Sequence, residues 1–256
     1  MKIRRIIHLL VGLSIALIAC GPDKNEGVIA LAADGIDDGK ELSVSLGCTH
    51  AEEPDLATAI IDDGVAKFRF VAEGPRMYYI KVKDFAGWLK VMADQGDRVK
   101  VKATAEKQLN RDGTLYYTFS NVVVKGSATH QEYEKRNLDL SRLNNIYPHY
   151  QNKYEDVLKA MSKATSQAQR DSVLATKRGK EMTAAEKEFF ETVKRINQQC
   201  YLENRDSWWG PLLMLDNMNF LSQDARDIYE QFSDRAKQSF YGKIAHDLLY
   251  PETESE

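Results

Sequence analysis

Hydrophobic and polar residues alternate along much of the chain between residues 27 and 126. A period of two residues is typical of a strand that has one buried face and one solvated face. The pattern predicts strands at 40–46, 66–71, 77–82, 88–92, 99–103 and 115–124, with turns rich in glycine, aspartate and proline between them. Many short alternating strands favour an antiparallel β-sandwich or barrel-like domain. On this prediction the charged side chains of Lys67, Arg69, Lys100 and Lys102 point to solvent.

At Gly126-Ser127 the spacing of apolar residues changes to three and four, which is typical of helices. Ser127 or Thr129 can cap the first helix, because either hydroxyl can accept a hydrogen bond from a free backbone N–H. The apolar positions of this helix and the next are Leu140, Leu143, Tyr147, Tyr154, Val157, Leu158 and Met161. We therefore expect an α+β protein with a helical domain at 127–250 after the β domain at 27–126, and a disordered tail at 251–256.

Thr183 and Glu186 have the spacing of a capping box and predict the start of a longer helix. Its apolar stripe, which we expect to be buried, consists of Phe189, Phe190, Val193, Ile196 and Cys200. Pro211 suits the first turn of a further helix. The last two helices are predicted to begin at Ser222 and Ser233, and their apolar stripes are Ile228, Tyr229 and Phe232, then Phe240, Ile244 and Leu248.

The 256 residues carry 35 basic and 38 acidic side chains, which gives a formal net charge of -3. This near balance indicates neither a nucleic-acid-binding protein nor an acidic disordered chain. No glycine-rich phosphate loop, dinucleotide fingerprint or Gly-x-Ser-x-Gly motif is present, so the sequence predicts no cofactor and no catalytic residues.

Residues 1–19 have the features of a secretory signal peptide. Lys2, Arg4 and Arg5 precede an apolar run that is too short to cross a bilayer as a mature helix. The cysteine directly after Leu17-Ile18-Ala19 resembles the lipobox of bacterial lipoproteins, in which Cys20 is acylated and becomes the first residue. The alternative is an ordinary cleaved signal with a chance cysteine.

The lipoprotein interpretation predicts a lipid anchor at Cys20 that holds the chain on a membrane, and a solvated tether at 20–26. Acyl chains bind the bilayer through methylene groups that contribute about 0.8 kcal/mol each. The protein is then expected in the cell envelope, and Gly21 after the cysteine is compatible with the outer rather than the inner membrane.

Two further cysteines, Cys48 and Cys200, would lie in an oxidising compartment where a disulfide can persist. They are far apart in the sequence, one in the predicted β domain and one on a predicted helix. The sequence leaves open a Cys48–Cys200 disulfide and two separate thiols.

Three other motifs contain residue types that can carry chemistry. Trp208-Trp209-Gly210-Pro211-Leu212 has the frame of a thioredoxin motif without its cysteines, and we expect it to anchor a helix. Cys48 and His50, with Glu52 and Glu53, lack the second ligand pair of a zinc site, so no metal is predicted. The pairs Tyr78-Tyr79 and Tyr116-Tyr117 place one ring on each sheet face, where an exposed ring can stack on sugar.

The strand region resembles domain of unknown function 4369, the N-terminal region of thioredoxin-like (AhpC/TSA-related) envelope lipoproteins. The resembling residues are Ile61-Asp62-Asp63-Gly64 before Ala66-Lys67-Phe68-Arg69-Phe70, Gly74-Pro75 before Tyr78-Tyr79-Ile80, Leu89-Lys90-Val91-Met92 before Gly96-Asp97, and Val122-Val123-Val124-Lys125-Gly126-Ser127. In the helical part, Tyr201-Leu202-Glu203-Asn204 and Tyr229-Glu230-Gln231-Phe232 resemble the linker of those proteins. The family's reductase activity belongs to a following thioredoxin domain with paired cysteines, so the resemblance implies architecture and location only.

These observations lead to one main hypothesis and two alternatives. The main hypothesis is a non-catalytic envelope lipoprotein that binds another envelope protein, such as a separate thioredoxin-like protein. The alternatives are a thiol-redox protein that uses Cys48 and Cys200, and a glycan-binding surface lipoprotein.

Overall fold

The structure is a computed structural model, and it describes residues 26–110, 112–137, 147–217 and 223–251. The predicted signal peptide, Cys20 and the tether up to residue 25 lie outside the described residues. Leu140, Leu143, Ser222 and positions 252–256 of the predicted tail also lie outside them.

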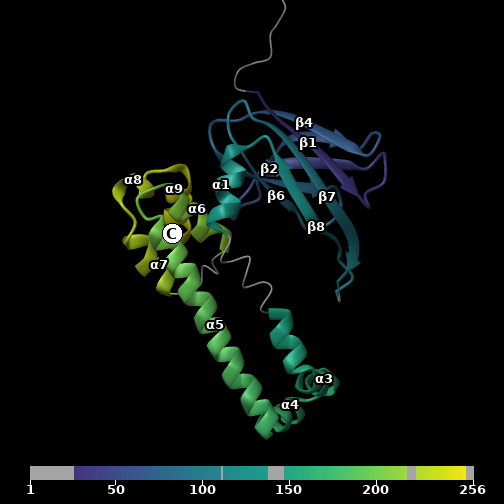
Figure 1. Cartoon of the computed structure of the whole chain (residues 1–256), viewed down its shortest axis with the longest axis vertical. Helices are drawn as coiled ribbons and strands as arrows, with labels where there is room; N and C mark the ends of the chain where they lie inside the picture. The colour runs from purple at the N-terminus through teal and green to yellow at the C-terminus, as the bar shows by residue number, and fades with distance from the viewer. Residues whose placement is uncertain (1–25, 111, 138–146, 218–222, 252–256) are drawn as a thin grey trace, which may run out of the picture.

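The α+β fold is confirmed, with two four-stranded sheets followed by helices (Figure 1). One sheet, which we call sheet A, has the strand order β4(Val65–Val71), β1(Glu26–Asp34), β7(Arg98–Leu109), β8(Leu115–Lys125). The other, sheet B, has the order β3(Asp55–Ile60), β2(Glu41–Leu46), β5(Arg76–Val82), β6(Leu89–Ala93). Apolar side chains from both sheets form one shared core, which includes Ile29, Phe68, Val101, Leu42 and Ile80. The strand region is therefore a sandwich.

The alternation of β4 follows the prediction, since Ala66, Phe68 and Phe70 are buried while Lys67 and Arg69 are exposed. Lys100 and Lys102 on β7 are exposed as well, so the outward orientation of these four side chains is confirmed.

The prediction of a purely antiparallel domain is wrong at one pair, because β1 and β7 run parallel in the centre of sheet A. A parallel pair needs a long connection between its strands, and here the chain forms all of sheet B between them. The pattern also gave no separate strand for β1 or β3. In β3 the inward positions are the half-buried Ala57 and Ala59, whereas the larger apolar residues Leu56 and Ile60 are exposed, so the strand lacks the usual pattern of large apolar residues inside.

Gly126 allows the chain to turn from β8 into the first helix, α1(Ala128–Arg136). It has a φ of 84°, and a Cβ there would collide with the carbonyl oxygen of Arg98. Of the two predicted caps, Ser127 is the one used, since its Oγ accepts a hydrogen bond of 3.1 Å from the backbone N–H of His130.

The remaining helices form two groups (Figure 1). Residues 147–153 are helical and lead to α3(Glu155–Lys163), α4(Gln167–Ala175) and the long α5(Lys177–Glu203). Beyond α5 follow α6(Trp209–Asn217), α7(Gln223–Glu230), α8(Asp234–Lys237) and α9(Phe240–Leu249), which gather at the C-terminal end of α5 beside the sandwich. We call residues 147–190, which project away from the sandwich, the helical arm. Within the described residues, none of the helices combines the length and apolar character that crossing a membrane requires.

The predicted capping box at Thr183 is wrong, because α5 already begins at Lys177. Thr176 is its cap and accepts a hydrogen bond of 3.0 Å from the backbone N–H of Gly179. Thr183 lies inside the helix, where its hydroxyl donates to the carbonyl of Gly179 over 3.1 Å. A threonine in a helix can bond the carbonyl four residues earlier, so the spacing of Thr183 and Glu186 does not by itself mark a helix start.

Two predicted apolar stripes also differ from the structure. None of the stripe residues from Phe189 to Cys200 is fully buried, and Phe190 is 55% exposed, because α5 extends away from the sandwich. On α9 the buried residues are Gly242 and the three that follow each predicted residue by one position, Tyr241, Ala245 and Leu249. Both sets have helical spacing, so only the contacts with the neighbouring helices decide which face is inside.

A second core joins the helices to the outer face of sheet B. It contains Tyr201, Leu212, Ile228 and Phe232 from the helices together with Met77 and Met92 from β5 and β6. Two side chains also accept hydrogen bonds from backbone N–H groups of these strands. The hydroxyl oxygen of Tyr241 accepts from Met77 over 2.6 Å, and Nδ1 of His130 accepts from Met92 over 3.0 Å. Because β6 is an edge strand, His130 protects a backbone group that is otherwise open to pairing.

The His130 contact predicts a stability that depends on pH. Burial lowers the pKa of His130 from 6.5, although the carboxylate of Glu134 opposes this shift. The folded state therefore favours the neutral imidazole. The contribution of His130 to the stability of the fold is fully present above pH 6.5 and declines as the pH falls below that value. His130→Asn keeps an acceptor atom without the titration, and should lose less stability than the wild type between about pH 7.5 and about pH 5.5 in urea denaturation.

The matched control for that experiment is His149→Asn, because His149 is an exposed histidine on the helical arm. This variant should keep the pH dependence of the wild type. Identical pH profiles for His130→Asn and the wild type would contradict the assignment.

Candidate functional site

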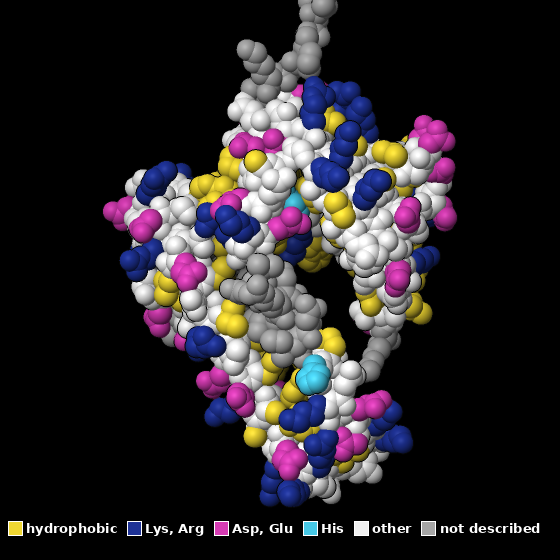
Figure 2. Space-filling model, in the orientation of Figure 1, with side chains coloured by type: hydrophobic (Ala, Val, Ile, Leu, Met, Phe, Trp, Pro, Cys, Tyr) yellow, Lys and Arg dark blue, Asp and Glu magenta, His cyan; other side chains and the backbone are white. Residues whose placement is uncertain are grey.

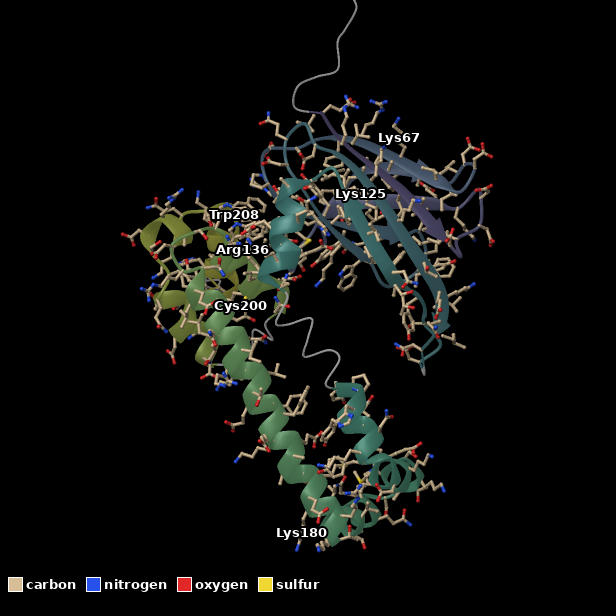
Figure 3. All side chains as sticks on the ribbon, viewed as in Figure 1. Lys67, Lys125, Arg136, Lys180, Cys200 and Trp208 are labelled. Carbon is tan, nitrogen blue, oxygen red and sulfur yellow. The ribbon has the colours of Figure 1, made fainter. Side chains whose placement is uncertain are left out.

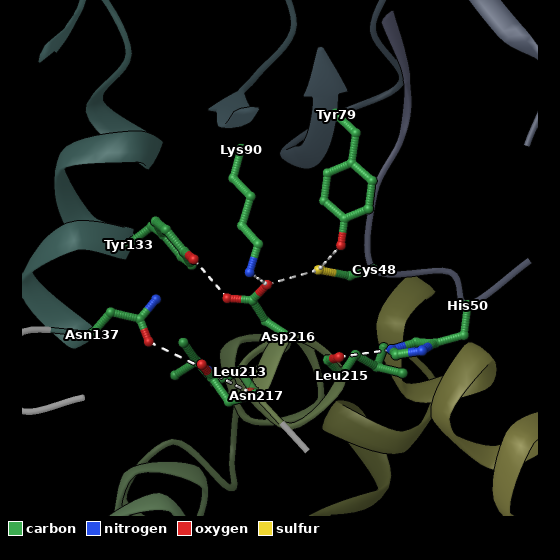
Figure 4. A network of polar contacts seen from close by, with 10 residues as sticks. All are labelled: Cys48, His50, Tyr79, Lys90, Tyr133, Asn137, Leu213, Leu215, Asp216 and Asn217. Carbon is green, nitrogen blue, oxygen red and sulfur yellow. Dashed lines mark hydrogen bonds and ion pairs between the residues drawn. The ribbon is translucent and has the colours of Figure 1, made fainter. Parts of the chain in front are cut away.

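A buried carboxylate lies where the helices meet the sandwich. Asp216 is the only acid in α6, an otherwise apolar helix whose residues from Trp209 to Leu215 are all buried. Its side chain is 2% exposed, and it points towards sheet B (Figure 4). A carboxylate in such surroundings is stable only when charged or hydrogen-bonding groups compensate for its lost hydration.

Three elements supply that compensation. Nζ of Lys90 on β6 lies 2.6 Å from Asp216 Oδ1, and the hydroxyl of Tyr133 on α1 donates to Oδ2 over 2.6 Å. The thiol of Cys48, in the loop after β2, donates to Oδ1 over 3.4 Å. We call these four residues together with Tyr79 the Asp216 cluster.

The thiol of Cys48 is held inside this cluster. Cys48 is 1% exposed, and its Sγ lies 3.5 Å from the hydroxyl oxygen of Tyr79. Burial raises the pKa of Cys48 well above its usual range, and the negative charge of Asp216 raises it further. The thiolate is the reactive form of cysteine, so Cys48 is a poor nucleophile at neutral pH.

The two tyrosines of the cluster are held in their neutral forms. Burial raises the pKa of Tyr79, and its contact with Cys48 adds to the shift. Burial also raises the pKa of Tyr133, and the carboxylate of Asp216 raises it further. The Asp216 cluster therefore contains one carboxylate and one ammonium group, surrounded by neutral donors that keep their protons. This arrangement suits a structural connection better than proton transfer.

Further contacts surround the cluster. Nε2 of His50 lies 2.7 Å from the carbonyl oxygen of Leu215, and Nδ2 of Asn217 donates to the carbonyl of Leu213 over 2.9 Å (Figure 4). The ring of Tyr79 stacks on Trp88 with 5.1 Å between the ring centroids. Trp88 is half exposed, so the cluster reaches the surface along this ring pair.

Cys48 and Cys200 are not joined to each other, so the structure does not contain the hypothesised disulfide. Their partners are different. Cys48 contacts Asp216 and Tyr79, whereas the thiol of Cys200 donates to the carbonyl of Arg136 over 3.5 Å. Cys200 is half-buried, which corrects the expectation that it lies on a buried face.

The residues of the considered metal site are only partly brought together. His50 and Glu53 line the same surface groove beside α9, whereas the buried thiol of Cys48 points to Asp216. Among the described residues, no group of three or more histidine, cysteine, aspartate and glutamate side chains is arranged to hold a metal ion.

The aromatic motifs have structural positions. Tyr78 lies in the sandwich core and Tyr79 on the opposite face, in the Asp216 cluster, so the predicted alternation of these rings is confirmed. Tyr117 is buried and Tyr116 half-buried. Trp209 and Leu212 anchor α6 in the second core, as expected, and the guanidinium of Arg136 lies 5.1 Å from the Trp209 ring centre.

Asp216, Lys90 and Tyr133 are members of this site that the sequence patterns did not predict. A usable signal was present in α6, where a single acid follows the run Leu212-Leu213-Met214-Leu215. Acids are rarely buried without a partner, so an aspartate in such a run indicates that compensating groups lie nearby in the fold. The identity of those groups is not visible in the sequence, because they come from β6, α1 and the loop after β2.

Asp216→Ala should destabilise the protein by about 3 kcal/mol in urea denaturation, because it leaves Lys90 and Tyr133 without their acceptor. The control is Asp206→Ala, which removes an exposed aspartate and should change stability by less than about 0.5 kcal/mol. The double variant Lys90→Met/Asp216→Leu should lose less than the sum of its single variants, because it leaves no unpaired charge. Equal losses for Asp216→Ala and Asp206→Ala would contradict the structural role of the cluster.

Comparison with known proteins adds no relative at this point: no protein-family model matches the chain, and no curated protein matches it.

Proposed function

We propose that this chain is a non-catalytic lipoprotein of the cell envelope that acts as a binding or interaction module. The observation that carries the proposal is the lipobox-like segment Leu17-Ile18-Ala19-Cys20, which ends six residues before β1 begins at Glu26. A folded body that starts so soon after an acylated cysteine is held close to the membrane by a short tether.

The Asp216 cluster supports a non-redox protein over the thiol-redox alternative. Disulfide exchange needs an accessible thiolate and a second thiol within reach. Cys48 is buried with a raised pKa, and Cys200 has a separate partner on α1. The cluster instead connects sheet B, α1 and α6, and so fixes the helices on the sandwich.

No observation favours the glycan-binding alternative. A sugar-binding ring needs a free face, but Tyr79 is stacked on Trp88 and its hydroxyl contacts Cys48. Tyr116 is half-buried in β8.

The helical arm supports the interaction role. Figure 3 shows α5 running from Cys200 beside the other helices to Lys180 near its far end. The buried core of the arm is small and consists of Tyr154, Val157 and Met182. Beside it, Tyr147 and Phe190 are 41% and 55% exposed, and each contacts the ring of Phe189. Exposed aromatic rings on a projecting element are typical of protein contact sites. Under the family resemblance, the partner is a separate thioredoxin-like protein.

Replacing the lipid acceptor tests the anchor. Cys20→Ala should abolish acyl labelling and remove the chain from the membrane fraction, because the thiol carries the lipid. Cys200→Ala is the matched cysteine control and should keep both properties. Normal labelling and normal membrane recovery of Cys20→Ala would overturn the lipoprotein proposal.

A photo-crosslinking amino acid at two positions tests the interaction role in intact cells. Position 190 should give a discrete crosslinked product, because Phe190 belongs to the exposed aromatic group. Position 180 is the control, since Lys180 is exposed on the same helix outside that group. Equal products from both positions, or none from position 190, would contradict a binding role for the arm.

A further inference from the structure

The outer face of sheet A carries a dense group of basic side chains. In the strand register, Val28 of β1 lies between Arg69 of β4 and Arg98 of β7. Ala30 lies between Lys67 and Lys100, and Lys100 is paired in turn with Lys125 of β8. Lys102 follows next to Ala32. All these cations are exposed, and we call the set the basic face: Lys67, Arg69, Arg98, Lys100, Lys102 and Lys125.

The basic face is compact and continuous. The strand spacing and the rise along β1 place the six cations within roughly 14 Å by 14 Å. Figure 2 shows Lys and Arg side chains gathered over β1, β4 and β7, and Figure 3 labels Lys67 and Lys125 on this sheet. In the centre Val28 is buried while Ala30 and Ala32 are half-buried, although all three face outwards. The long basic side chains therefore flank a floor of small residues.

This grouping is unfavourable for the isolated fold. Like charges on directly opposed strand positions, such as Lys100 and Lys125, destabilise a sheet. Among the described residues, Arg69 is the one member of the basic face with an ion pair, to Glu26 over 3.0 Å. The whole chain has a net charge of -3, so the basic face concentrates positive charge that the protein as a whole does not carry.

Along β1, the cations of the basic face lie beside residues 28–32, in the middle of the strand. Glu26 stands at its start, and the exposed acids Asp34, Asp37 and Asp38 lie at and just after its end. The start of β1 is also the end that continues towards Cys20. The six Cα–Cα steps from Cys20 to Glu26 can span at most about 20 Å. An acylated Cys20 therefore keeps the start of β1 within about 20 Å of the bilayer, and the first strand positions of the basic face lie two residues further along, beside Val28.

We propose that the basic face of sheet A docks on anionic phospholipid headgroups beside the lipid anchor. The inference rests on the proposed function, because the anchor at Cys20 is what places this face next to a bilayer. Six cations grouped on one sheet face suit a surface of repeated phosphates, and Val65, Val71 and Val123, exposed around the set, give it apolar contacts at the interface. Docking in this position turns sheet B, the helices and the helical arm away from the membrane, where the arm is open to a partner.

Vesicle sedimentation of the lipid-free mature chain tests the docking. The chain from residue 20 with Cys20→Ser should bind phosphatidylcholine vesicles that contain about one third phosphatidylglycerol, and not vesicles of phosphatidylcholine alone. Binding should weaken at least tenfold when sodium chloride is raised from about 50 mM to about 500 mM, because salt screens the attraction. The triple variant Lys67→Gln/Lys100→Gln/Lys125→Gln should bind about a hundredfold more weakly.

The matched control is Lys163→Gln/Lys180→Gln/Lys187→Gln, which removes three exposed lysines from the arm and makes the same change in net charge. It should bind as the wild type does, and both triple variants should keep the wild-type circular dichroism spectrum. Equal weakening in both variants, no binding of the wild type, or binding to neutral vesicles would overturn the proposal. Binding to duplex DNA in preference to anionic vesicles would overturn it too.

This experiment is independent of the acylation test, since it uses a chain without lipid. Loss of vesicle binding with normal acyl labelling in cells would reject the docking face and leave the lipoprotein proposal intact. Normal vesicle binding without acyl labelling would reject the anchor instead.

Discussion

The compensation of one buried charge fixes how the two halves of this protein meet. Asp216 lies in an apolar helix, where an unpaired carboxylate is strongly unfavourable. Its donors come from β6, α1 and the loop after β2, so the charge is satisfied only when these elements and α6 are assembled together. The apolar contacts around Met77 and Met92 favour the same arrangement without specifying it as strictly, because apolar packing has little directionality.

The two outer faces of the sandwich are consequently different. The helices cover the outer face of sheet B, where Met77, Tyr79 and Met92 are apolar or aromatic. The outer face of sheet A is bare and carries the basic face. The two sides of the molecule therefore differ: β1, which starts near the proposed anchor, lies in the sheet that carries the cations, and the helical arm extends through α5 from the helices that cover the other sheet (Figure 1). In the proposed function, one side of the sandwich contacts the membrane while the opposite side presents the arm to a partner.

The arm and the body differ in how much core supports them. The body has two cores that include residues distant in sequence, whereas the buried core of the arm contains three residues, all within residues 147–190. A segment with few buried apolar contacts has low local stability. The aromatic rings that remain exposed on it are available for a partner without disturbance of the sandwich.

The sequence alone determined the class of the fold and most strands, because a half-buried strand needs alternation and a turn needs glycine, aspartate or proline. It also predicted a lipid anchor at Cys20 and the outward orientation of the lysines on the strands, since both predictions depend on residues adjacent in the chain. Only the tertiary structure decided the parallel pairing of β1 with β7, the buried face of α9 and the composition of the Asp216 cluster. Each of these depends on contacts between residues far apart in sequence. Phe240 and Tyr241 show what the sequence pattern alone cannot decide. Each belongs to an apolar stripe of helical spacing, and only the packing in the second core buries Tyr241 more deeply than Phe240.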